Sequence, residues 1–117
     1  MRKPWPLSTT DRRFAQWIRE RDRMCMACGS RDALQCSHYF GRRIMALRFS
    51  PENCVSLCDR CHKAWEKDKK GPYRQFMILR MGLVRFEGME AIAHRCIEKK
   101  REAIERCRRF LEGGGTE

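Results

Sequence analysis

The chain has 117 residues, of which 26 are lysine or arginine and 15 are aspartate or glutamate, so its formal net charge is +11. This length allows one domain and excludes nucleotide-binding and barrel enzymes of ordinary size, while 42% hydrophobic residues exclude a chain disordered by composition. The positive charge favours a polyanionic partner, nucleic acid first, over a merely solvated basic protein. Residues 1–6 lack an apolar signal region and no run is long enough to span a membrane, so we expect a cytoplasmic protein without a membrane partner.

Five short elements are expected in the first part of the chain. Phe14, Trp17 and Ile18 recur at the spacing of an amphipathic helix. Pro72 and Gly82 each mark a point where a helix stops. In chain order, we expect a helix, two strands and two helices over 10–23, 34–40, 54–57, 60–69 and 73–81.

The last segment is expected to form one long amphipathic helix over 87–112. Its apolar residues return near one face: Met89, Ile92, Cys96, Ala103, Cys107 and Phe110. This helix can pack on the domain, pair with a second copy in a homodimer, or lie along DNA. The chain then divides into a domain at 1–84, a C-terminal helix at 85–112 and a flexible tail at 113–117.

Four of the eight cysteines form two Cys-x-x-Cys pairs about 30 residues apart, Cys25 with Cys28 and Cys58 with Cys61. This spacing predicts a structural Zn²⁺ site with four thiolate ligands. A disulfide framework is not expected, because the spacing differs from that of small secreted proteins. The remaining cysteines are expected to pack in the core: Cys36, Cys54, Cys96 and Cys107.

Three polar residues between and beside these pairs form a candidate catalytic set. On the expected order of elements, His38 lies on the first strand, Asn53 at the entry to the second, and His62 in the first turn of the next helix. Side chains from three elements can then converge on one cleft. A single histidine more often has a structural role, but its combination with two flanking cysteine pairs favours a functional site.

This pattern resembles the HNH endonucleases of the ββα-metal group over roughly residues 17–82. The matching residues are His38, Asn53 and Cys58-Asp59-Arg60-Cys61-His62, with Cys25 and Cys28 upstream. Within that group the chain is most similar to the NinG (Rap) recombination endonucleases of lambdoid phages. That similarity is carried by 18–23, Cys28-Gly29, His38-Tyr39, 47–49, Asn53 and Tyr73-Arg74. The resemblance implies an α+β fold, in which a ββα-metal unit with a four-cysteine zinc site is flanked by an N-terminal helix and C-terminal helices.

The resemblance also implies metal-dependent hydrolysis of DNA that leaves 5′-phosphate and 3′-hydroxyl ends. His38 becomes the general base, Asn53 orients it, and His62 binds a divalent cation distinct from zinc: Mg²⁺, Mn²⁺ or Ni²⁺. Many HNH sites carry aspartate or histidine before the first histidine, where this chain has Ser37. Glu66 lies one helical turn after His62, so we expect Ser37, His62 and Glu66 around the catalytic cation. The alternatives are a shell completed by phosphate and water, an impaired site, or a Glu66 that only pairs with nearby lysines.

Three arginines between the two strands, Arg42, Arg43 and Arg48, can hold phosphates beside the scissile bond, or else form a solvated basic loop. We therefore expect a DNA endonuclease of phage recombination, with branched DNA as substrate, or of DNA packaging, together with a partner protein of that process. Two rival hypotheses remain. One is a zinc-stabilised nucleic-acid-binding module without catalysis, and the other is a partner protein that docks through its C-terminal helix.

Overall fold

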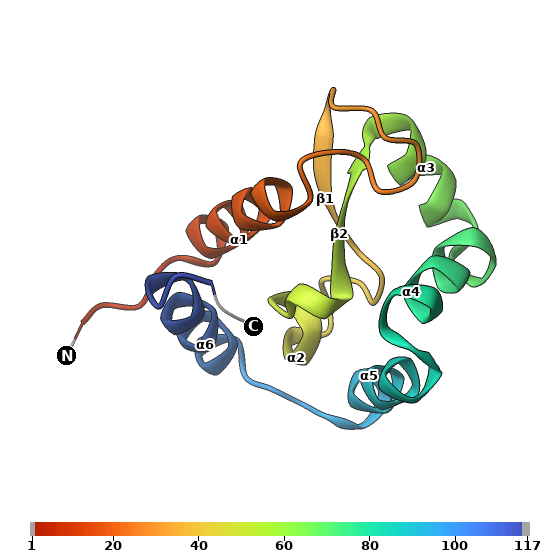
Figure 1. Cartoon of the computed structure of the whole chain (residues 1–117). Helices are drawn as coiled ribbons and strands as arrows, with labels where there is room; N and C mark the ends of the chain where they lie inside the picture. Colours follow the sequence, from red (N-terminus) through yellow and green to blue (C-terminus); the bar gives the residue numbers. More distant parts are fainter. Residues whose placement is uncertain (1, 116–117) are drawn as a thin grey trace.

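The structure is a computed structural model that describes residues 2–115 (Figure 1). Strands β1 (Leu34–His38) and β2 (Cys54–Cys58) form a hairpin at the centre of an α+β domain. Helical elements surround the hairpin: α1 (Leu7–Asp22), α2 (Met45–Arg48), η1 (Pro51–Asn53), α3 (Asp59–Lys67), η2 (Lys69–Tyr73), α4 (Arg74–Met81), α5 (Leu83–Arg95) and α6 (Lys100–Glu112). The order helix, strand, strand, helix, helix over the first part of the chain agrees with the sequence prediction.

The two strands pair antiparallel, from Leu34 opposite Cys58 to His38 opposite Cys54. Strand β2 is buried along its whole length, whereas β1 is partly exposed. Successive side chains of a strand face opposite sides. In β1, Ser37 therefore contacts η2, and His38 contacts α1. One strand thus supplies functional groups to both sides of the hairpin.

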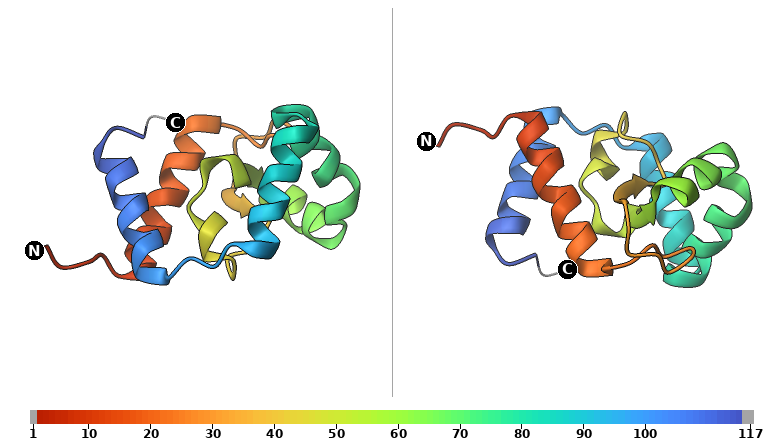
Figure 2. Two further views of the ribbon diagram at one scale, coloured as in Figure 1. Left: turned by 90° about the horizontal axis from the view of Figure 1, so that it is seen from below. Right: turned by 90° about the horizontal axis from the view of Figure 1, so that it is seen from above.

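Two hydrophobic clusters lie on opposite sides of the hairpin. The first is covered by α3, α4 and α5 and includes Val55, Leu57, Tyr73, Met77, Phe86 and Met89. The second joins α1 to α6 and includes Phe14, Ile18, Phe49, Ala103, Ile104 and Cys107. Figure 2 shows α1 and α6 side by side on one side of the hairpin, with α3, α4 and α5 on the other. Burial of these apolar surfaces holds the helices against the hairpin.

Helix α1 begins earlier than the sequence predicts. It starts at Leu7, after Pro6, and the Thr10 amide and hydroxyl both donate to the Pro6 carbonyl at 3.0 and 2.9 Å. Thr10 therefore lies in the second turn and does not cap the helix. At the other end, the Asp22 carboxylate accepts a hydrogen bond from the Ser56 amide of β2 at 2.8 Å. This bond fixes the end of α1 beside the hairpin.

The expected single helix over 87–112 is wrong, because the segment forms two helices, α5 and α6, separated by residues 96–99. Met89 of α5 packs in the first cluster, whereas Ala103 of α6 packs in the second. These clusters lie on opposite sides of the hairpin, so one straight helix cannot reach both. The chain crosses between them in an extended segment, drawn in light blue in Figure 1.

The crossing segment also changes the expected burial of two cysteines. Cys107 is buried in α6, as predicted. Cys96 directly follows α5 and is exposed, so its predicted place in the core is wrong. Lys99 interrupts the apolar face in the sequence, and the structure packs the apolar residues before and after it in different clusters.

The flexible tail expected at 113–117 is described only in part. Gly113 and Gly115 donate backbone hydrogen bonds to Arg109 and Phe110 of α6, which the sequence does not predict. Residues 116–117 lie outside the described residues. Across residues 2–115, no helix has both the length and the apolar character that crossing a membrane requires.

Candidate active site

The two Cys-x-x-Cys pairs come together at one end of the hairpin. Cys25 and Cys28 lie in the loop after α1, Cys58 ends β2, and Cys61 lies in the first turn of α3. Their four sulfur atoms are all within 4.8 Å of one another, and the Sγ atoms of Cys28 and Cys58 are 3.8 Å apart. A tetrahedral zinc ion with Zn–S bonds of about 2.3 Å separates its sulfur ligands by about 3.8 Å. The cluster therefore has the geometry to bind a metal such as zinc.

The local backbone prepares these thiols for a cation. The Cys58 sulfur is the N-terminal cap of α3 and accepts a hydrogen bond from the Cys61 amide at 3.5 Å. Burial raises the pKa of Cys25, but hydrogen bonds from backbone amides outweigh it and lower the pKa to about 6. Burial and the three neighbouring thiols raise the pKa of Cys61 to about 12. Four crowded thiols resist joint ionisation unless a cation binds them, and metal binding then deprotonates all four.

A cleft of about 530 Å³ opens along the exposed edge of β1. It is lined from α1, β1, the loop after β1, α3 and η2, by residues that include Asp11, Arg19, Gln35, Cys36, His38, Arg42, His62, Glu66 and Lys69. Two of the three predicted catalytic residues, His38 and His62, therefore share one cleft. The third, Asn53, is fully buried behind it.

His38 is held as a neutral base on the α1 side of the cleft. Its Nε2 lies 2.9 Å from the carbonyl oxygen of Arg48, and a carbonyl only accepts, so Nε2 carries the proton. Nδ1 is left with a free lone pair. Burial lowers the pKa of His38 to about 4, and the positive charge of Arg42 adds to this effect. The imidazole is therefore neutral at physiological pH.

Asn53 fixes the loop that carries the partner of His38. Its Nδ2 donates to the carbonyls of Phe40 and Leu47 at 2.9 and 3.1 Å, and its Oδ1 accepts from the Phe40 amide at 2.8 Å. These bonds join the start and the end of the loop between β1 and η1. Because the Arg48 carbonyl follows Leu47 directly, Asn53 positions the acceptor that orients the imidazole.

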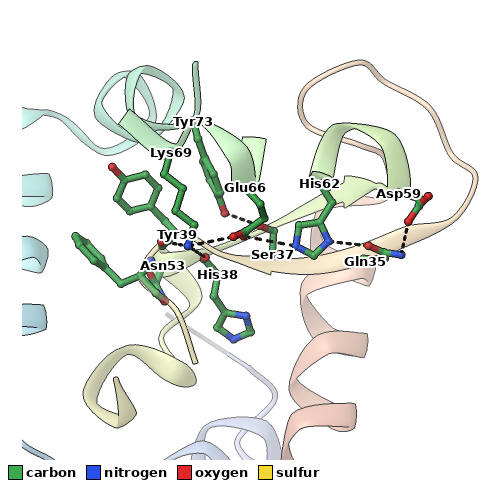
Figure 3. Close-up of polar contacts among 11 residues, drawn as sticks. Gln35, Ser37, His38, Tyr39, Asn53, Asp59, His62, Glu66, Lys69 and Tyr73 are labelled. Atoms are coloured by element: carbon green, nitrogen blue, oxygen red, sulfur yellow. Dashed lines mark hydrogen bonds and ion pairs between the residues drawn. The ribbon is translucent and has the colours of Figure 1, made fainter. Parts of the chain in front are cut away.

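His62 and Glu66 form a second pair on the α3 side of the cleft. The Nδ1 of His62 donates to the side-chain oxygen of Gln35 at 2.6 Å, and Nε2 on the other side of the ring lies 3.7 Å from the Glu66 carboxylate. Figure 3 shows the His62 ring between Gln35 and Glu66, while the His38 ring extends to the other side of β1. A histidine oriented in this way, next to a carboxylate, is a typical pair of ligands for a divalent cation.

Ser37 does not join this pair. Its side chain is fully buried, and its hydroxyl lies 2.8 Å from the Tyr73 hydroxyl, with which it shares a hydrogen bond. The predicted place of Ser37 in the shell of the catalytic cation therefore does not fit the structure. The hydroxyl is engaged with Tyr73, and Ser37 is not among the residues that line the cleft.

The three predicted DNA-contacting arginines separate into two kinds. Arg42 and Arg43 are exposed in the loop after β1, and Arg42 lines the cleft. Arg48 instead donates two hydrogen bonds to the Asp11 carboxylate, at 2.6 and 2.9 Å, and a third to the Arg42 carbonyl. The guanidinium of Arg48 is thus part of the support of the loop, and its predicted role in binding phosphate does not fit this geometry.

The residues of the cleft that the sequence did not predict as site residues include Gln35 and Lys69, although pairing of Glu66 with a nearby lysine was one of the alternatives. Gln35 orients His62, and Lys69 places its ammonium 3.3 Å from Glu66 and 2.9 Å from the Tyr39 carbonyl. Strand periodicity offered a signal for Gln35, because it shares a face of β1 with Ser37. Nothing in the sequence distinguishes Lys69 from the neighbouring lysines, since its position depends on the bend at η2.

The comparisons with known proteins bear on the family of the chain and not on the roles of single residues. Neither curated proteins nor solved structures include a significant match. The profile of the family described as Bacteriophage Lambda NinG protein matches residues 2–113. Because this match covers almost all of the chain, the chain belongs to the NinG family.

Proposed function

We propose that this protein is a metal-dependent HNH endonuclease that hydrolyses phosphodiester bonds of DNA. One observation carries the proposal: a neutral histidine with an anchored Nε2 and a histidine–carboxylate pair line the same cleft, on opposite sides of one strand. The hairpin followed by α3 also has the order of elements that the ββα-metal group implies.

His38 is the general base of the proposed reaction. Its Nδ1 accepts a proton from water while the water oxygen attacks the phosphorus atom. The bond between phosphorus and the 3′ oxygen breaks, and the 3′ oxygen leaves as a hydroxyl after taking a proton from solvent. The lowered pKa keeps this nitrogen free of a proton at neutral pH. A bound phosphate brings negative charge into the cleft, which raises the pKa of His38 and makes it a stronger base in the complex.

His62 and Glu66 would hold the catalytic cation, Mg²⁺, Mn²⁺ or Ni²⁺. Such a cation supplies stabilisation of the charge on the phosphate and on the leaving 3′ oxygen. The hydrogen bond from Nδ1 to Gln35 keeps the Nε2 of His62 directed toward Glu66. With two protein ligands, the remaining positions are open to water and to a phosphate oxygen of the substrate.

The net charge of +11 and the exposed Arg42 and Arg43 support DNA as the partner. Contacts to phosphate bind DNA without reading its sequence. Membership of the NinG family supports a phage-encoded role, which we propose to be recombination on branched DNA, or DNA packaging.

Cleavage of a plasmid by the zinc-loaded protein, with each of the three divalent cations, tests the activity. His38→Ala is the informative variant. His94→Ala is the matched control, because His94 lies on α5, away from this cleft. We expect nicking that depends on the cation, is lost by about 10²–10⁴-fold in His38→Ala, and is unchanged in His94→Ala.

A second candidate function is a zinc-stabilised module that binds nucleic acid without cutting it. The burial of Ser37 against Tyr73 favours it, because the cation loses a ligand there. Tight, salt-dependent DNA binding by the unaltered protein, with no cleavage under any of the three cations, would establish this function and reject the nuclease.

A further inference from the structure

A second group of metal-binding side chains lies on the α1 side of the hairpin, separate from the four-cysteine cluster. The sulfur atoms of Cys36 and Cys54 and a ring nitrogen of His38 all lie within 4.8 Å of one another. We propose that these three residues form a site for a soft divalent cation such as Zn²⁺, and that this site includes the general base.

The hairpin itself brings the three ligands together. His38 lies directly opposite Cys54 in the antiparallel register, and Cys36 lies two residues before His38 on the same strand. Residues two apart on a strand share a face, so all three side chains project toward α1. The group therefore rests on rigid strand geometry, which fixes ligand positions better than a loop does.

The chemistry of the ligands selects the cation. Two thiols and one imidazole suit Zn²⁺, Co²⁺ or Cd²⁺, whereas Mg²⁺ and Mn²⁺ prefer oxygen ligands. The site is thus distinct in metal preference from the His62–Glu66 pair. Cys54 is fully buried, but Cys36 and His38 line the cleft, so a cation can enter from solvent. Three protein ligands leave a fourth tetrahedral position toward the cleft.

Occupation of this site conflicts with catalysis. Nε2 of His38 donates to the Arg48 carbonyl, so Nδ1 holds the lone pair that a cation would take. The same lone pair accepts the proton of the attacking water in the proposed reaction. A soft cation and the general base therefore exclude each other, and zinc beyond one equivalent should inhibit cleavage. This consequence rests on the proposed function, whereas the binding of the cation does not.

The test is a Co²⁺ titration of the full chain that already carries one zinc ion in the four-cysteine cluster. Retention of that zinc is checked by elemental analysis. Sulfur-to-cobalt charge-transfer absorption reports thiolate ligation, which the His62–Glu66 pair does not provide. We expect the absorption to saturate at one added equivalent.

Cys36→Ser is the informative variant, because Cys36 is half-buried at the border of the second cluster and serine is close to cysteine in size. Cys96→Ser is the matched control, because Cys96 is exposed and lies on the crossing segment. We expect Cys36→Ser to lower the affinity for the added Co²⁺ by at least about 100-fold. Cys96→Ser should leave this affinity unchanged.

Absence of the sulfur-to-cobalt absorption in the unaltered protein, or its survival in Cys36→Ser, would overturn the proposed site. Zinc inhibition of cleavage is a separate readout and should be relieved in Cys36→Ser. A protein that binds Co²⁺ as expected but cuts no DNA retains the site and rejects only the proposed nuclease.

Discussion

The two sides of the hairpin are built for different tasks, although one strand serves both. On the α3 side, His62, Glu66 and Gln35 are polar, partly exposed and close to the four-cysteine cluster. On the α1 side, the His38 ring donates to the Arg48 carbonyl, and burial lowers its pKa to about 4. Alternation along β1 therefore directs Gln35, the partner of His62, toward α3 and directs His38 toward α1. A substitution on one side of the hairpin should therefore leave the other side unchanged as a reference.

Loss of the zinc cluster should have the largest effect. In Cys61→Ser, one thiolate ligand is lost, and we expect the tightly bound zinc to fall from one equivalent to none and stability to drop by several kcal/mol. Amide hydrogen exchange should rise most in α3 and β2 and least in α6, because α6 packs on α1 in the second cluster. Cys96→Ser is the control. Equal loss of protection in α3 and α6 would show that the two sides do not differ in their dependence on zinc.

The stability of the protein should depend on pH through His38, which lies on the α1 side of the hairpin. The pKa of His38 is about 6.5 in the unfolded chain and about 4 in the folded protein. Between these two pH values the unfolded state binds more protons than the folded state. The contribution of His38 to the free energy of unfolding is therefore fully present above pH 6.5. It decreases by roughly 3 kcal/mol as the pH falls to 4.

Urea unfolding of the protein and of His38→Gln at several pH values measures this contribution. The difference between the two proteins cancels effects of acid on the zinc cluster. A stability difference that does not change from pH 7 to pH 4 would contradict a neutral, buried His38.

Removal of the Asn53 amide should disturb the loop without touching the cleft. Asn53→Ala removes the partner of the Phe40 amide, a donor to the Phe40 carbonyl and one of the donors to the Leu47 carbonyl, which also accepts from the Ser50 amide. We expect this loss to cost about 1–3 kcal/mol. Cleavage should fall further than stability explains, because the Arg48 carbonyl loses its fixed place beside His38. Mn²⁺ affinity should not change. A variant with reduced stability and full specific activity would show that Asn53 supports only the fold.

Gln35→Ala should have the smallest effect and should act on the α3 side alone. Without the Gln35 oxygen, the His62 ring loses the partner that directs Nε2 toward Glu66. We expect Mn²⁺ affinity to fall by about 10-fold, with stability nearly unchanged. Isothermal titration measures the affinity, and unchanged binding would remove Gln35 from the site.

The sequence predicted most of the features that depend on local spacing. Both Cys-x-x-Cys pairs, the strand positions and the helix that carries His62 follow from short-range patterns. The prediction of a single C-terminal helix was wrong because it depends on tertiary packing. The pattern of apolar residues does not show which side of the hairpin each half of the segment contacts. The break at residues 96–99 is set by the two clusters.

The candidate site shows the same division. His38, His62 and Glu66 were predicted from spacing, and the structure places them along one cleft. Arg48 and Ser37 were assigned from position alone, and the structure gives them partners far away in the sequence, Asp11 and Tyr73. Such partners cannot be predicted from a single sequence, because they depend on how the elements pack.

The most direct test of the account compares Mn²⁺ affinity and DNA cleavage in His38→Gln and His62→Ala. Mn²⁺ is a hard cation and avoids the thiols on the α1 side. The account predicts that both variants lose cleavage, that Mn²⁺ binding falls by at least about 10-fold in His62→Ala, and that it is unchanged in His38→Gln. Equal loss of Mn²⁺ binding in both variants, or full cleavage in either, would contradict the separation of base and cation across β1.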